Sequence, residues 1–134
     1  MNQDDQHLKL LSIFHYVFGA VTAVFSLFGL IHLTIGLFMV LAPEKLDARV
    51  PPPAFIGWVF AIAGAAIIVV GWLFAAFIIT TGRFLARRGH YQFCLVMGAI
   101  ECLLMPLGTV LGVFTILVLS RLAVKAAFEA DRAA

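Results

Sequence analysis

The charged residues of this chain gather in short clusters that separate three long apolar runs, and this spacing constrains the fold more than any other feature. The runs cover residues 10–43, 50–82 and 89–120, and the third contains a single charge, Glu101. Only 12% of the residues are charged and the mean hydropathy is +1.09, whereas soluble domains average about 25% charged residues. A water-soluble domain is therefore excluded. We expect one all-α domain over residues 1–134, a polytopic transmembrane helical bundle.

The length of the runs leaves the number of membrane crossings open. Each run would form a helix of about 50 Å, which is too long for one crossing of a hydrocarbon core of about 30 Å and too short for two. Three straight spans would divide the nine basic residues five to four, without the cytoplasmic excess of Lys and Arg that membrane proteins show. If the third run folds back at Pro106, the division becomes seven to two, with only Lys45 and Arg49 outside. A break in the first run at residues 26–29 would give six to three.

We therefore expect four spans with both termini in the cytoplasm, over about residues 10–41, 54–81, 85–106 and 109–128. Pro106 lacks a backbone N–H and clashes with the preceding helical turn, and Gly108 relaxes the backbone beside it. The alternative is that Pro106 only kinks one long, tilted helix.

Small residues recur at helical spacing in each run, which is typical of faces where membrane helices pack closely. We expect the following glycines to lie at helix contacts: Gly19, Gly29, Gly36, Gly64, Gly98, Gly108 and Gly112. The simplest interpretation of these stripes is the dry core of a helical bundle.

Glu101 is the residue that most needs a partner, because a bare carboxylate at mid-membrane costs at least about 2.5 kcal/mol. In the four-span arrangement Glu101 and His32 lie at similar depth, so we predict that they pair, either as a static clasp or as a proton relay. Thr22 and Ser26 would lie beside them on an ion path. His15 and His90 are expected nearer the cytoplasmic interface, within reach of water.

The basic cluster Arg83, Arg87 and Arg88 is expected to anchor the topology, and its alternative role is binding of anionic lipid headgroups. A net charge of +2, without an arginine-rich arm, gives no reason to expect nucleic acid. No HExxH, GxSxG or CxxC motif occurs in the sequence, and we expect no cofactor or metal. A metal or redox site from His90, Cys94 and Met105 is a weaker alternative.

Four segments carry a resemblance to a known group of proteins. They are Leu8-Lys-Leu-Leu-Ser-Ile-Phe-His-Tyr-Val17, Tyr91-x-Phe-Cys94, Cys102-x-x-x-Pro106-x-Gly108-Thr109-x-Leu111-Gly-Val-Phe-Thr-Ile116 and Val118-Leu-x-Arg121. The chain resembles small bacterial inner-membrane proteins with several spans and no assigned activity. The resemblance implies a bacterial cytoplasmic membrane and marks His15, Cys94, Cys102, Pro106 and Gly108 as positions of the pattern.

These features favour a non-enzymatic integral membrane protein that acts by assembly in the lipid bilayer. It would be a homo-oligomer or an accessory subunit of another membrane protein. The second hypothesis is a small oligomeric cation or proton channel, or a transporter, that uses Glu101 and His32.

Overall fold

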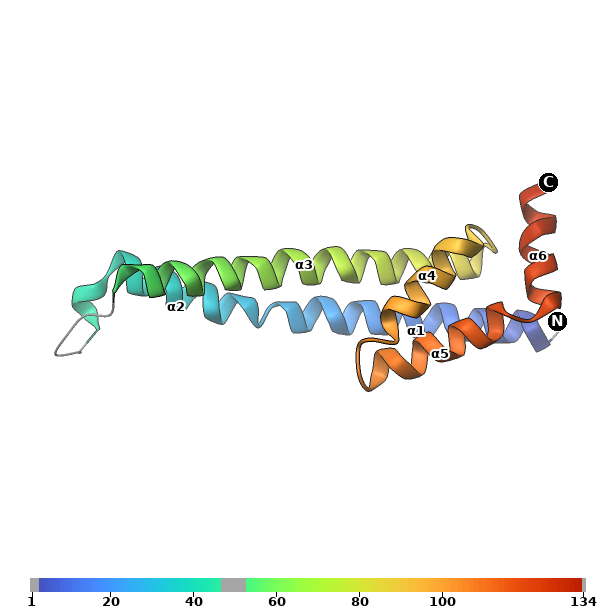
Figure 1. The fold of residues 1–134 in the computed structure, drawn as a ribbon, viewed down its shortest axis with the longest axis horizontal. Helices are drawn as coiled ribbons and strands as arrows, with labels where there is room; N and C mark the ends of the chain where they lie inside the picture. The colour runs from blue at the N-terminus through green and yellow to red at the C-terminus, as the bar shows by residue number, and fades with distance from the viewer. Residues whose placement is uncertain (1–2, 47–52, 134) are drawn as a thin grey trace. The chain divides into compact units, whose positions relative to one another are not determined.

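A computed structural model describes residues 3–46 and 53–133 of the chain, and Arg49 lies outside them. Helices account for almost all of the described residues, and none of these residues forms a strand. The elements are α1 (Gln3–Ser26), α2 (Gly29–Leu41), the short 3-10 helix η1 (Pro43–Lys45), α3 (Ala54–Ala86), α4 (Tyr91–Glu101), α5 (Leu107–Leu119) and α6 (Leu122–Ala133). Figure 1 shows them along the chain.

The first apolar run forms α1 and α2, which are separated by Leu27 and Phe28. At this break the backbone tightens to bonds between residues three apart, such as Leu27 N–H to the Val24 carbonyl at 3.1 Å. The helix starts at Gln3 rather than near residue 10, because the polar residues before Leu10 continue the same helical turns. Together α1 and α2 are 39 residues long and apolar enough to cross a membrane.

The second apolar run forms one uninterrupted helix, α3, of 33 residues. It continues to Ala86, beyond the boundary expected near residue 81, because nothing in Thr80–Ala86 breaks a helix before the turn at Arg87. α3 is also long and apolar enough to cross a membrane. The described residues therefore hold two spans, or three if the bent pair α5 and α6 counts as one.

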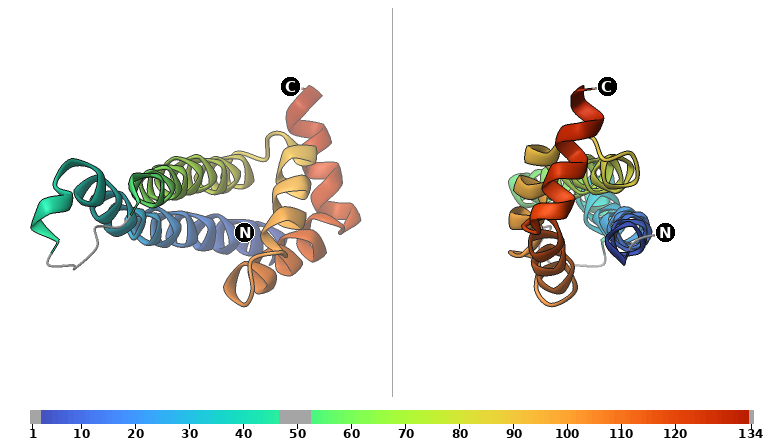
Figure 2. Two further views of the ribbon diagram at one scale, coloured as in Figure 1. Left: turned by 60° about the vertical axis from the view of Figure 1, so that its left-hand side comes forward. Right: turned by 90° about the vertical axis from the view of Figure 1, so that its right-hand side faces the viewer.

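The third apolar run folds back on itself at Pro106. α4 and α5 lie side by side in opposite directions, joined by residues 102–106 (Figures 1 and 2). The expected helices over 85–106 and 109–128 are too long, because α4 has 11 residues and α5 has 13. At 1.5 Å per residue the two helices are about 17 and 20 Å long, well short of a hydrocarbon core. α6 then bends away from α5 by 77°.

The contacts divide the chain into two compact units, each containing parts of α1 and α3. Unit 1 comprises residues 1–20 and 75–134, and unit 2 comprises residues 21–74. In unit 1, buried apolar residues from α1, α3, α4, α5 and α6 form a core, and they include Leu11, Leu85, Leu119 and Phe128. In unit 2, α2 packs against the first half of α3 through glycines. A Cβ on Gly36 would lie 2.3 Å from the Ala61 nitrogen, and one on Gly64 would lie 2.4 Å from the Leu33 nitrogen.

Candidate functional site: a buried histidine and glutamate

The polar centre of unit 1 is a contact between His15 on α1 and Glu101 on α4. His15 Nε2 lies 3.1 Å from Glu101 Oε2, and both side chains are 0% exposed. The two atoms are close enough for strong electrostatic attraction, although their alignment does not make a regular hydrogen bond. A fully buried acid and base in contact are the strongest candidate for a functional site in this unit.

The other ring nitrogen fixes the orientation of His15. Nδ1 lies 2.8 Å from the carbonyl oxygen of Leu11, one turn earlier on α1. A carbonyl oxygen only accepts hydrogen bonds, so Nδ1 must carry a hydrogen. Nε2 is then either an unprotonated acceptor facing a protonated Glu101 or a donor from imidazolium to carboxylate. In both cases the pair has no net charge and holds one proton between its two groups.

Close packing of the helices allows this contact. Gly82 of α3 lies against α1, where a Cβ would stand 3.1 Å from His15 Cβ. Beside it the Ser12 hydroxyl donates a 2.7 Å hydrogen bond to the Gly82 carbonyl. On the other side, a Cβ on Gly108 would lie 2.5 Å from the Glu101 carbonyl oxygen. The small residues thus let α3 approach α1 beside His15 and let α5 approach α4 beside Glu101.

One oxygen of Glu101 has no partner. Oε1 is buried and makes no hydrogen bond with any described residue. The nearby buried hydroxyls are not available as donors, because Thr81 donates to the Phe77 carbonyl at 2.9 Å and Thr115 donates to the Leu111 carbonyl at 2.8 Å. Glu101 is also the last residue of α4, where the helix dipole disfavours a negative charge.

The partner expected for Glu101 has to be corrected from His32 to His15. His32 belongs to unit 2, where it is exposed on α2 and its ring lies 6.0 Å from the ring of Phe60. The expectation of equal depth assumed that the third run forms a full-length helix to residue 106, whereas α4 ends at Glu101. His15 is fully buried, so its expected position within reach of water is also wrong.

Two further residues are predicted to lie on an ion path with Glu101. Thr22 and Ser26 belong to unit 2. Thr22 is half-buried, while the Ser26 hydroxyl is buried and donates to the Ala23 carbonyl at 2.7 Å. Ser26 also packs closely on Gly71, because a Cβ added to Gly71 would lie 2.3 Å from the Cβ of Ser26. Its role in this structure is therefore helix packing.

The glycines expected at helix contacts all have a neighbour close to the position of a Cβ. Gly29 and Gly64 face each other between α2 and α3, and Gly98 and Gly112 face each other between α4 and α5. Gly19 lies on the Ile79 side chain of α3. For each of the seven predicted glycines, the nearest atom lies between 2.3 and 3.2 Å from the position of a Cβ, so larger side chains would push the helices apart.

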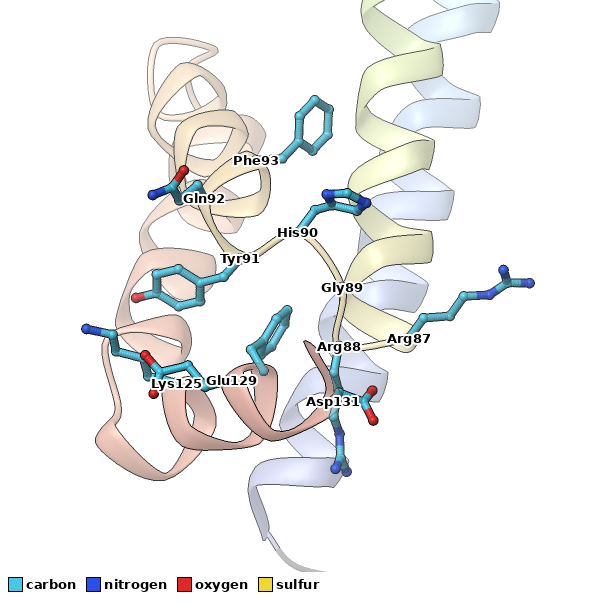
Figure 3. Close-up of a pocket in the computed structure, with 11 residues that line it drawn as sticks. Arg87, Arg88, Gly89, His90, Tyr91, Gln92, Phe93, Lys125, Glu129 and Asp131 are labelled. Atoms are coloured by element: carbon cyan, nitrogen blue, oxygen red, sulfur yellow. The ribbon is translucent and has the colours of Figure 1, made fainter. Parts of the chain in front are cut away.

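The predicted headgroup arginines have different surroundings. Arg88 is paired with Asp5, while Arg83 and Arg87 are exposed. Arg87 and Arg88 line a cavity of about 800 Å³ between the turn after α3 and α6. Figure 3 shows the two arginine side chains extending in different directions, and Glu129 and Asp131 of α6 also line the cavity. The mixed charge of this cavity does not favour an anion.

The alternative metal site is not assembled. Within residues 3–46 and 53–133, no three His, Cys, Asp or Glu side chains are grouped so that they could hold a metal ion. His90 is exposed beside Phe84, Cys94 is buried as a free thiol, and Met105 is 84% exposed. These residues have no common centre for a ligand.

Comparison with known proteins finds no family model, no curated protein and no solved structure that matches this chain. The chemistry of the described residues is therefore the basis for inferring a function.

Proposed function

We propose that this protein is a non-enzymatic, multi-pass integral membrane protein that acts by assembly with a second copy of itself or with another membrane protein. The observation that carries the proposal is His32. This histidine is exposed on α2, inside an apolar helix long enough to cross a membrane. Polar side chains within spans almost always face protein or water rather than lipid. Within the chain, His32 Nδ1 lies 3.4 Å from the Phe28 carbonyl oxygen of its own helical turn, and a partner helix on this face would give Nε2 a polar neighbour.

The topology that fits these helices has two full crossings and a re-entrant hairpin. The first crossing is α1 with α2, and α3 returns to the starting side. α4 and α5 then enter the bilayer and leave on that same side, since each is too short to cross. This arrangement supports the expected cytoplasmic location of both termini and keeps the seven-to-two division of basic residues. It differs from four full spans only in the depth that the hairpin reaches.

The sparse burial of the two long apolar helices also supports assembly. In the most apolar stretches of Gln3–Leu41 and of α3, only 17% of the residues are buried within the chain. The face of α2 that carries His32 also presents the exposed Ile35, three residues further along the helix. The bacterial cytoplasmic membrane implied by the resemblance is the location that we propose.

Self-association in lipid tests the proposal. The full chain would be reconstituted in lipid vesicles, and energy transfer between labelled copies would be followed as the lipid-to-protein ratio rises. We expect association that weakens in His32→Leu and is unchanged in Thr34→Leu, a control at an exposed polar residue of α2 that bonds only within its own helix. Co-purification of a membrane partner that is lost only in His32→Leu would support the accessory-subunit form. A wild-type chain that stays monomeric and purifies alone would overturn the proposal.

The channel hypothesis is the second candidate, and the unpartnered oxygen of Glu101 favours it. Proton or cation flux into the same vesicles would be compared with that into empty vesicles. Flux that Glu101→Gln abolishes would replace the assembly proposal with an oligomeric channel. We expect wild-type vesicles to match empty ones, because the pair lies in a closed interior rather than on a path.

A further inference from the structure

We infer that His15 and Glu101 form an occluded site for one proton, which exchanges with water only when the α4–α5 hairpin opens by movement of α5 away from the end of α4. This inference is independent of the proposed assembly. It rests on the 3.1 Å contact between Nε2 and Oε2, on the complete burial of both side chains, and on the unpartnered Oε1.

The charge of the pair explains why the closed site keeps one proton. Losing the shared proton would leave a carboxylate beside a neutral imidazole, and gaining a second would leave an imidazolium beside a neutral acid. Either change puts an unpaired charge in an interior with no solvent contact, and an uncompensated buried charge is strongly destabilising. The proton can move between Oε2 and Nε2 without changing the net charge, but it cannot leave cheaply while the site is closed.

The surroundings offer no relay to water. Besides His15 and Glu101, the buried polar side chains of the described part of unit 1 are Ser12 from α1, Thr81 from α3, Thr115 from α5 and Cys94 from α4. Each of the three hydroxyls donates its hydrogen to a backbone carbonyl. Cys94 is the one titratable group among these four, and its thiol is fully buried. The other charged side chains whose burial is described in this unit, including Asp4 and Arg121, are at least partly exposed.

The hairpin is the element whose movement would expose the site. Glu101 is the last residue of α4, next to the connection over residues 102–106. That connection is open to its surroundings, with Leu103 81% exposed. α5 closes over Glu101 through Gly108, where a Cβ would lie 2.5 Å from the Glu101 carbonyl oxygen. A methyl group at this position must push α5 away from the end of α4.

Infrared spectroscopy with hydrogen–deuterium exchange tests this site in the full chain in lipid vesicles. The carbonyl band of a protonated carboxylic acid identifies Glu101 if the band is absent from Glu101→Gln. If the proton is on His15 instead, ¹⁵N NMR of the imidazole follows the same exchange at Nε2. Gly108→Ala opens the hairpin, and Gly64→Ala is the matched control because it meets an equally close backbone in unit 2.

We expect the shared proton to exchange at least about tenfold more slowly in the wild type than in Gly108→Ala, since exchange requires local opening. Gly64→Ala should exchange like the wild type. Equal rates in the wild type and Gly108→Ala would overturn the inference. If Gly108→Ala does not fold, the pH response of the wild-type signal tests the inference by itself. An Nε2 or carboxyl signal that follows the pH of the bulk solution without delay would show that the site is open.

Discussion

The two units of this chain hold membrane helices together in different ways. Unit 1 surrounds a buried acid–base pair with apolar side chains and adds an interhelical hydrogen bond from Ser12. Unit 2 relies on backbone contact, because Gly29 faces Gly64 and Gly36 faces Gly57. In lipid there is little hydrophobic force between helices, so either polar attraction or close packing has to supply the stability. This chain uses polar attraction in unit 1 and close backbone packing in unit 2.

The difference also has a consequence for function. Close backbone packing works only through shape, and it leaves the outer face of α2 to lipid or to a partner. A buried charged pair depends on its protonation and its partner as well as on shape. We therefore expect unit 1 to respond both to removal of a single polar group and to added volume, and unit 2 to respond to added volume alone.

The largest effect should come from breaking the buried pair. His15→Leu leaves Glu101 without its partner and should lower the free energy of unfolding by about 3–5 kcal/mol. The measurement is denaturation in mixed detergent micelles followed by circular dichroism. Replacing both residues with Leu should recover most of the loss, and Gln92→Leu, at an exposed polar position of α4, is the control. A loss below about 1 kcal/mol in His15→Leu would mean that the pair is not what holds α4 to α1.

Added volume in unit 2 should have the next largest effect. In Gly36→Ala the new methyl would lie 2.3 Å from the Ala61 nitrogen, so α2 and α3 must separate at a cost of about 1–3 kcal/mol. Spin labels on the two helices should report a longer distance. Ala66→Val adds volume at an exposed position of α3 and should leave the distance unchanged. An unchanged distance in Gly36→Ala would refute close backbone packing.

Removing the serine hydroxyl should have a smaller effect. Ser12→Ala loses the buried 2.7 Å bond to the Gly82 carbonyl and should lower the free energy of unfolding by about 0.5–1.5 kcal/mol. Thr80→Ala is the matched control, because the exposed Thr80 hydroxyl bonds only within its own helix, to Ala76. Equal losses in the two variants would show that the interhelical bond adds nothing to unit 1.

The surface ion pairs should matter least. Asp4 Oδ1 lies 2.9 Å from a guanidinium nitrogen of Arg121, and both side chains are partly exposed. Asp4→Asn should therefore cost less than about 1 kcal/mol at low salt, and the cost should vanish at high salt. The measurement is the free energy of unfolding at two salt concentrations. A large loss that persists at high salt would show that surface pairs, rather than the buried pair, stabilise unit 1.

Much of the architecture could be predicted from the sequence. The charge clusters delimit the apolar runs, and Pro106 marks the place where the third run turns back between α4 and α5. The small-residue stripes identify glycines such as Gly36 and Gly112 that contact neighbouring helices. These features depend on local composition and on helical periodicity, which a single sequence records directly.

The partner of Glu101 could not be predicted in this way. The sequence contains both His15 and His32 on the same apolar run, and His15 belongs to the segments that carry the resemblance. Choosing between them requires the depth at which α4 meets α1. That depth depends on where α4 starts and ends. The turn over residues 87–90 shortens α4 at its start, and the connection over residues 102–106 shortens α4 at its end.

The sequence by itself thus determined that this chain is an all-helical membrane protein and that Glu101 requires a polar partner, because hydropathy and charge are properties of the residues. Only the tertiary structure decided that the partner is His15 and that the third run forms two short helices. Pairing across helices depends on their lengths and on how closely their backbones approach, and residues 86 positions apart come together only when the chain has folded.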